Sequence, residues 1–252
     1  MLWTGVAQAY AQSFAHLCAG AAPALLDGLP GPGRLLDVGC GTGALVLAAR
    51  EAGHDAAGVE PDPEMAALAG SLLGEDVVVA GLPDLPWADD GFDAVVAGFV
   101  LNHVDDPAAG ARELARVAAP GGAVRATIWG STPPPQATMW NGLLDEAGAV
   151  RPPSPRLPVD RDFDRSPDGL ADLLGQAGLA VTSTGTTSWR WHVAPDDLWV
   201  GLTSVGNFGV LWRAQPDDVQ ARLRTAYHAL ADGQDLTFDV ECVLTEARVP
   251  RS

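Results

Sequence analysis

The stretch Leu35-Leu36-Asp37-Val38-Gly39-Cys40-Gly41-Thr42-Gly43-Ala44 (LLDVGCGTGA) decides the fold class. Its first residues are mostly apolar, as in a buried strand, and the glycines that follow permit a tight turn before a helix at 42–52. Glycines at such a turn also let a ligand approach the backbone N–H groups at the start of the helix. The stretch therefore predicts a ligand-binding loop after the first strand of an α/β sheet.

Short β-rich runs alternate with helical stretches on both sides of this loop, which is typical of a parallel sheet with crossover helices. We expect strands at residues 34–38, 55–59, 76–80, 92–99 and 123–129, and helices at 42–52, 62–73 and 107–118. Asp62 can cap the second of these helices, and Pro63 suits its first turn. The residues Pro120-Gly121-Gly122 predict a turn before the fifth strand.

The regular alternation of strands and helices ends after residue 129, where proline-rich connectors at 131–135 and 151–158 appear. We expect further elements at 4–29 (one or two helices), 137–149 and 166–177 (helices), 179–193 (strand), 195–231 (helices) and 236–249 (strand). The pattern predicts one domain, 1–252, with a Rossmann-like, seven-stranded, mostly parallel sheet and an antiparallel last strand. Its core spans about 31–130, and a helical cap comes from 1–29, 131–165 and 195–232.

Composition limits the partners. The 252 residues carry a formal net charge of −17, and all 15 basic residues are arginine. This acidity argues against nucleic acid or an anionic membrane as partner. The three cysteines are far apart, so neither a disulfide framework nor a metal site is predicted. The N-terminus lacks a basic segment, and no apolar run reaches the ~20 residues that span a membrane, so we expect a cytoplasmic protein.

Asp37 distinguishes between two possible ligands of the glycine loop. From Gly39 the loop fits the dinucleotide pattern G-x-G-x-x-A, but a carboxylate two residues earlier would repel a pyrophosphate. The same carboxylate would attract the ammonium and sulfonium of S-adenosylmethionine. Glu60, at the end of the second strand, can accept hydrogen bonds from ribose hydroxyls with either ligand. The charge of Asp37 therefore favours S-adenosylmethionine.

Four motifs carry a resemblance to a known family. They are LLDVGCGTG at 35–43, GVEPDPEM at 58–65, LPWADDGFDAVVAGFVLNHV at 85–104 and ELARVAAPGGAVRATIW at 113–129. With them the sequence resembles the class I S-adenosylmethionine-dependent methyltransferases, particularly the small-molecule group similar to ubiquinone/menaquinone-biosynthesis C-methyltransferases. The resemblance covers roughly residues 3–129.

The resemblance implies a set of cofactor-binding residues. These are Tyr10, Phe14, Asp37, Gly39, Cys40, Gly41, Glu60, Pro61, Gly81, Leu82 and Phe99. Tyr10 and Phe14 would close over the methionine part, and Phe99 would border the sulfonium. The family usually has an acidic residue at the position of Gly81. That departure leaves the adenine to Leu82 and backbone groups, unless Asp84 reaches it.

Methyl transfer needs alignment and exclusion of water more than a fixed catalytic group. His103 follows the fourth strand and resembles the histidine of the family's L-H-H-V motif. His192 ends the long strand beside the cap. Either could act as a general base, or both could be structural. Asn102 could orient a ligand, or it could cap the next helix.

Six of the eight tryptophans lie in the second half of the chain. They would mainly fill a core built from small residues, but an aromatic substrate pocket is the alternative. Trp140, Asn141 and Trp191 are the residues that we predict as pocket walls.

The most consistent function is methyl transfer to a small, specialised-metabolite acceptor, with no metal; the oligomeric state and the methylated atom stay open. One alternative is a cofactor-binding protein that does not methylate, used for cyclisation or ligand sensing. Another is a nicotinamide-dependent oxidoreductase, which Asp37 disfavours.

Overall fold

The computed structural model describes residues 4–153 and 157–251. The helices are α1 (Ala7–Gln12), α2 (Phe14–Ala19), α3 (Ala22–Leu26), α4 (Ala44–Glu51), α5 (Pro63–Leu73), α6 (Pro107–Val117), α7 (Pro135–Glu146), α8 (Pro167–Gln176), α9 (Pro195–Ser204), α10 (Gly206–Arg213) and α11 (Asp217–Ala231). The strands are β1 (Arg34–Val38), β2 (Asp55–Glu60), β3 (Val78–Val79), β4 (Phe92–Gly98), β5 (Ala118–Ile128), β6 (Ala180–Val193) and β7 (Leu236–Arg248).

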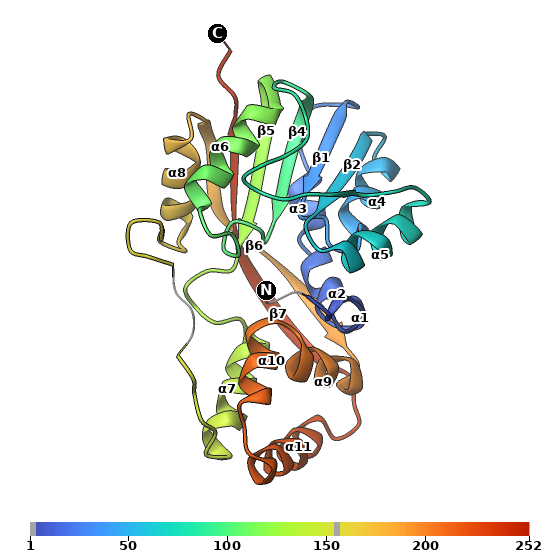
Figure 1. Cartoon of the computed structure of the whole chain (residues 1–252), viewed down its shortest axis with the longest axis vertical. Coiled ribbons are helices and arrows are strands. Elements are labelled where there is room, and N and C mark those ends of the chain that lie inside the picture. Colours follow the sequence, from blue (N-terminus) through green and yellow to red (C-terminus); the bar gives the residue numbers. More distant parts are fainter. Residues whose placement is uncertain (1–3, 154–156, 252) are drawn as a thin grey trace. The chain divides into compact units, whose positions relative to one another are not determined.

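The strands form one seven-stranded sheet in the order β3-β2-β1-β4-β5-β7-β6. Figure 1 shows β2, β1, β4 and β5 side by side in this order. Neighbouring strands from β3 to β5 are parallel, and β7 is antiparallel to β5. The predicted fold class is therefore confirmed. Because the carboxyl ends of β1, β2 and β4 meet at one edge, the loops after these strands are brought together there.

Two compact units divide the chain. One contains Met1–Gly20, Pro133–Pro155 and Trp189–Val240, and the other contains Ala21–Thr132, Arg156–Ser188 and Glu241–Ser252. We call them the helical unit and the sheet unit. The predicted assignment of cap and core segments within a single domain stays a prediction.

Alternation along the strands gives the sheet unit two apolar layers. Leu36 and Val38 of β1 pack in a cluster with buried residues of α6 and α8. Leu35, on the opposite face, packs with residues of α4 and α5. This alternation places Asp37 on the α4 side, so the side chain is buried in spite of its charge.

Several predicted elements differ in detail. The N-terminal segment forms three short helices, and the third strand is reduced to Val78–Val79. The predicted turn at Pro120-Gly121-Gly122 lies inside β5, where the register against β4 shifts. Gly121 takes a φ of +81° at this irregularity, which explains why glycine is needed. Asp62 caps α5 as predicted, because its carboxylate accepts from the N–H groups of Glu64 and Met65 at 3.0 Å each.

Candidate functional site

The glycine loop between β1 and α4 has a backbone that only glycines adopt easily. Gly39, Gly41 and Gly43 have φ values of +70°, +55° and +88°. The N–H groups of Gly39 and Cys40 donate to the carbonyl of Val59, at 2.8 and 3.0 Å, and so attach the loop to the end of β2. A Cβ at Gly39 would lie 2.5 Å from Cγ2 of Val100. Conformation and space together therefore exclude a side chain at position 39.

Glu60 organises the loop from the end of β2. Its side chain is buried, and Oε2 accepts from the N–H of Gly41 at 2.9 Å while Oε1 accepts from the N–H of Asp62 at 3.1 Å. Burial raises the pKa of Glu60, and the two N–H donors oppose this rise. Each carboxylate oxygen has a second lone pair. Glu60 can thus hold the loop and still accept hydrogen bonds from a ligand.

Asp37 is a buried acid without a cation. The residue is only 3 % exposed, and among the described residues its carboxyl has no hydrogen-bond partner. Desolvation, and then the nearby charge of Glu60, raise its pKa from 3.8 to about 8. Asp37 is therefore mostly protonated at neutral pH when no ligand is bound. The sequence argument treated Asp37 as a negative charge at neutral pH, whereas its burial and the nearby Glu60 favour the protonated form there.

Gly81 packs where the resemblance led us to expect an acidic residue. A Cβ at this position would lie 3.0 Å from Cβ of Pro61, so a side chain would require Pro61 to move. The carbonyl of Gly81 accepts from the N–H of Asp84 at 3.1 Å, whereas the side chain of Leu82 packs toward α6. Close packing against the segment after Glu60 explains the glycine.

The ends of β4 and β5 carry a strained aromatic pair. Phe99 has a φ of +60°, which is an outlier for a bulky residue, and its N–H donates to the carbonyl of Thr127 at 2.9 Å. Its ring stacks on Trp129 with a centroid distance of 4.3 Å. Such strain is typical of functional sites. Asn102, just beyond, does not cap α6: Asp106 does, by accepting from the N–H of Ala109 at 2.8 Å. Within the described chain, Oδ1 of Asn102 is buried without a partner.

The two candidate histidines differ in their surroundings. His103 is exposed by its solvent-accessible area, yet many protein atoms surround its ring. Desolvation of the ring, followed by the positive charge of Arg165, lowers the pKa of His103 to about 4. The direction agrees with a neutral ring at pH 7, which would be a weak base toward a hydroxyl. His192 is exposed, and its Nδ1 lies 2.9 Å from Oγ1 of Thr237. The proposed general-base roles of both remain predictions.

The remaining predicted residues belong to the helical unit. Phe14 is buried, with ring centroids 6.2 Å from Trp191 and 5.4 Å from Phe208. Trp191 is also buried and stacks on Phe238 at 5.6 Å. Tyr10 lies in α1. These contacts place Phe14 and Trp191 in one aromatic cluster.

Trp140 has no exposed surface, and its ring centroid lies 6.0 Å from Trp199 and 6.4 Å from Trp212. The neighbouring Asn141 accepts from Arg151 at 2.9 Å. Trp140 thus contributes to the core of the helical unit, which agrees with the packing role expected for most tryptophans. Its role as a pocket wall, like those of Asn141 and Trp191, stays a prediction.

A substitution in the glycine loop tests whether its geometry is needed. We expect Gly39→Ala to lower the affinity for S-adenosylhomocysteine at least tenfold, because the new Cβ meets Val100 and the φ of +70° disfavours alanine. Isothermal titration calorimetry would measure this. The matched control is Gly142→Ala, inside α7, where no atom lies within 4 Å of the added Cβ. Equal affinity of both variants would contradict the assignment of the loop.

The chain is similar to known methyltransferases. Residues 36–126 match the family described as "Methyltransferase domain". An uncharacterised methyltransferase of Mycobacterium leprae is 42 % identical over 109 residues, covering 40 % of each chain. The ubiquinone/menaquinone biosynthesis C-methyltransferase UbiE of Geotalea daltonii is 39 % identical over 102 residues, covering 36 % of this chain and 43 % of the relative. The matches thus span about two fifths of these relatives' length.

A solved structure agrees with the fold. The YcgJ protein of Bacillus subtilis superposes with a TM-score of 0.57 at 19 % identity, over 94 % of this chain and 99 % of that one. Among the described residues, no group of three or more His, Cys, Asp or Glu side chains is arranged to hold a metal ion. The described helices include none that is both long and apolar enough to cross a membrane. Residues 36–126 are similar to the methyltransferase domain, and the chain resembles the class I S-adenosylmethionine-dependent methyltransferases of the UbiE type.

Proposed function

We propose that this protein transfers the methyl group of S-adenosylmethionine to a small organic acceptor. The observation that carries the proposal is the Asp37 carboxyl, which is buried beside the glycine loop and has no partner among the described residues. A nearby cation stabilises the anionic form of a buried acid that has no hydrogen-bond donor of its own. S-adenosylmethionine is such a cation, whereas a dinucleotide would bring further negative charge.

The residues present fit this cofactor. Asp37 supplies a site for a positive group, and Glu60 retains acceptor capacity for hydroxyls. The positive φ angles of Gly39, Gly41 and Gly43 set the backbone of the loop between β1 and α4. The bound cofactor would supply an activated methyl group on sulfur. The chain would hold the acceptor in line and exclude water, which are the main requirements for this displacement. The other cofactor contacts, Tyr10, Phe14, Cys40, Gly41, Pro61, Gly81, Leu82 and Phe99, belong to the same proposal.

A small, specialised metabolite is the acceptor that the charge of the chain favours. With a net charge of −17, the protein would repel nucleic acids and anionic membranes. The proposed pocket walls are Trp140, Asn141 and Trp191, and the proposed compartment is the cytoplasm. The pKa of His103 is lowered to about 4, so His103 would be a weak general base. An acceptor that needs little help from a base, such as a neutral amine, therefore fits this site better than an alcohol.

A label-transfer experiment tests the function. The protein would be incubated with S-adenosylmethionine carrying a deuterated methyl group and with extracts of its source cells. We expect a labelled metabolite, whose fragmentation in the mass spectrometer locates the methyl on oxygen, nitrogen or carbon. Tight binding of S-adenosylhomocysteine without any labelled product would favour the non-methylating alternative, cyclisation or ligand sensing. No binding at all would contradict the cofactor assignment.

A further inference from the structure

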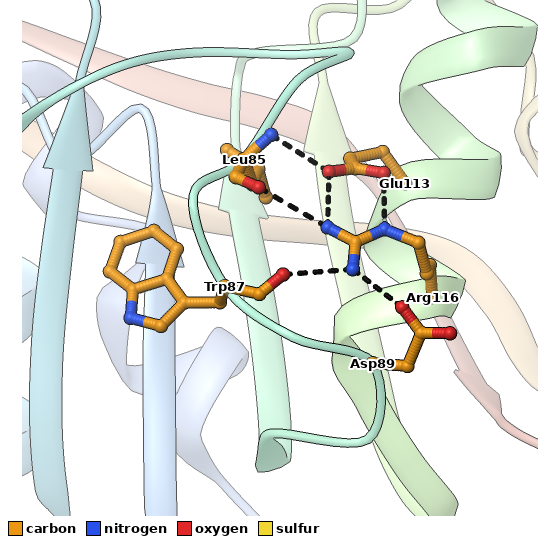
Figure 2. A network of polar contacts seen from close by, with 5 residues as sticks. All are labelled: Leu85, Trp87, Asp89, Glu113 and Arg116. Carbon is orange, nitrogen blue, oxygen red and sulfur yellow. Dashed lines mark hydrogen bonds and ion pairs between the residues drawn. The ribbon is translucent and has the colours of Figure 1, made fainter.

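An arginine on α6, Arg116, forms hydrogen bonds to the loop at 82–90. Arg116 donates through Nε and Nη2 to the two carboxylate oxygens of Glu113, at 2.8 and 2.7 Å, in a bidentate pair (Figure 2). Its Nη1 donates to the carbonyl of Trp87 and to Oδ1 of Asp89, at 2.8 and 2.7 Å. Its Nη2 also reaches the carbonyl of Leu85 at 3.3 Å. The guanidinium thus joins α6 to three positions of the loop at 82–90.

The same pair of residues satisfies the backbone of the loop. Oε1 of Glu113 accepts from the N–H of Leu85 at 2.7 Å, and the carbonyl of Arg116 accepts from the N–H of Asp90 at 3.0 Å. Glu113 and Arg116 therefore bind four backbone groups between residues 85 and 90. An ordinary surface ion pair joins side chains only and contributes little. Here the two side chains and the carbonyl of Arg116 replace hydrogen bonds that a helix or strand would supply.

Contacts near the start of this loop connect it to the glycine loop between β1 and α4. At its start, Gly81 is bridged to Asp84 and lies against Pro61. Pro61 follows Glu60, whose carboxylate holds the N–H of Gly41. A continuous series of contacts thus runs from Arg116 to the backbone of the glycine loop.

Packing against α6 supports the other side of the loop. A Cβ at Gly110 would lie 3.2 Å from Cδ1 of Leu82 and 3.3 Å from Cδ2 of Leu101. A glycine inside a helix costs about 1 kcal/mol relative to alanine. Here it lets Leu82 pack close to α6. Leu82 is therefore held by packing at the point where the loop begins.

We infer that Arg116 and Glu113 are positioning residues that hold the loop at 82–90 in place as the recognition surface for the purine base of the cofactor. The inference rests on the proposed function. Since Gly81 has no side chain and lies close to Pro61, base recognition falls to backbone groups, which recognise a ligand selectively only if the loop is held in one conformation. Arg116 would supply that rigidity through its contacts with Glu113 and with the loop.

Binding measurements with two ligands test this role. The probes are S-adenosylhomocysteine and its hypoxanthine analogue, in which an oxygen replaces the amino group of the base. We expect the wild-type protein to bind the adenine ligand at least tenfold more tightly, because a donor is exchanged for an acceptor. In Arg116→Ala, we expect at least tenfold weaker binding of S-adenosylhomocysteine and a preference below threefold. Arg116→Lys should recover the preference only in part, since lysine lacks the planar fork.

A matched control separates positioning from general destabilisation. Arg222 on α11 also pairs with a carboxylate, that of Asp218, at 2.9 Å, and donates to a distant carbonyl, that of Ala147. Arg222→Ala should leave both affinities within twofold of wild type. Glu113→Gln is the milder second variant if Arg116→Ala does not fold. It keeps an acceptor for Leu85 but weakens the pair with Arg116, so the preference for adenine should fall.

The outcomes are distinct. Unchanged preference in folded Arg116→Ala and Glu113→Gln, in a wild-type protein that binds S-adenosylhomocysteine, would overturn the inference and leave the proposed function intact. A wild-type protein that does not distinguish the two bases would overturn it as well. A wild-type protein that binds neither ligand would instead contradict the proposed function.

Discussion

Replacing Asp37 by asparagine is expected to stabilise the unliganded protein and to weaken S-adenosylhomocysteine binding more than tenfold, or by over ~1.4 kcal/mol. The two effects have one cause. Burial of the Asp37 carboxyl lowers the free energy of unfolding of the unliganded protein. When the ligand binds, the same carboxyl attracts the ammonium group of the ligand. A gain of about 2 kcal/mol at pH 7 corresponds to a rise of roughly 4–8 °C in Tm.

The pH dependence of stability has a definite sign. The folded pKa of Asp37, about 8, lies above its ordinary value of 3.8. Between these values the unfolded chain is ionised at this position and the folded chain is protonated. The contribution of Asp37 to the free energy of unfolding is therefore greatest below pH 4, falls as the pH rises toward 8, and is constant above that. Asp37→Asn should remove this part of the pH dependence.

Proton release offers a second measurement of the same residue. Binding a cationic ligand at pH 7 should release close to one proton from wild type and almost none from Asp37→Asn, as measured by calorimetry in buffers of different ionisation enthalpy. Asp55→Asn, an exposed position at the start of β2, is the control and should behave like wild type. Equal proton release from all three proteins would contradict a buried, protonated Asp37.

Replacing Arg125 by methionine is expected to lower the free energy of unfolding by about 3 kcal/mol. Arg125 lies on β5 and is 5 % exposed. It donates to the carbonyls of Ala24, Leu25 and Asp27 at the end of α3, and to Glu246 of β7 at 2.8 Å. Methionine fills similar volume but leaves these carbonyls without a donor. Urea denaturation would measure the loss.

Arg190→Met is the matched control for this substitution. Arg190 also lies on a strand and pairs with a carboxylate, Asp239, at 3.1 Å, but both side chains are largely exposed. Its loss should change stability by less than about 0.5 kcal/mol. Similar losses in the two variants would show that burial of the Arg125 contacts has little effect.

Much of the sheet unit was predictable because its signals are local. The glycine loop, the run at β4 and the Asp62-Pro63 start of α5 each depend on a few adjacent residues. The strand at 123–129 was predicted, but not its extension back to Ala118. That extension requires β4 as a neighbour and a bulge at Gly121, and neither can be read from local sequence.

The site was less predictable where partners are distant in sequence. Asp37 was identified by its position before the loop, but its protonation depends on burial and on Glu60, which only the folded chain brings near. Arg116 and Glu113 have a helical i, i+3 spacing, which indicates an ordinary surface pair. Nothing in that spacing shows that they hold the backbone of Leu85 and Trp87. The close approach of Gly81 to Pro61 is likewise a tertiary feature.

The hydrogen bonds from Arg125 to the end of α3 also define where the chain can be shortened. Residues up to Gly20 belong to the helical unit, whereas α3 supplies acceptors to an arginine in the centre of the sheet unit. A truncation that removes α3 would leave a buried guanidinium facing missing carbonyls. A fragment that keeps these hydrogen bonds of the sheet unit must therefore begin at or before Ala21, and not at the first strand.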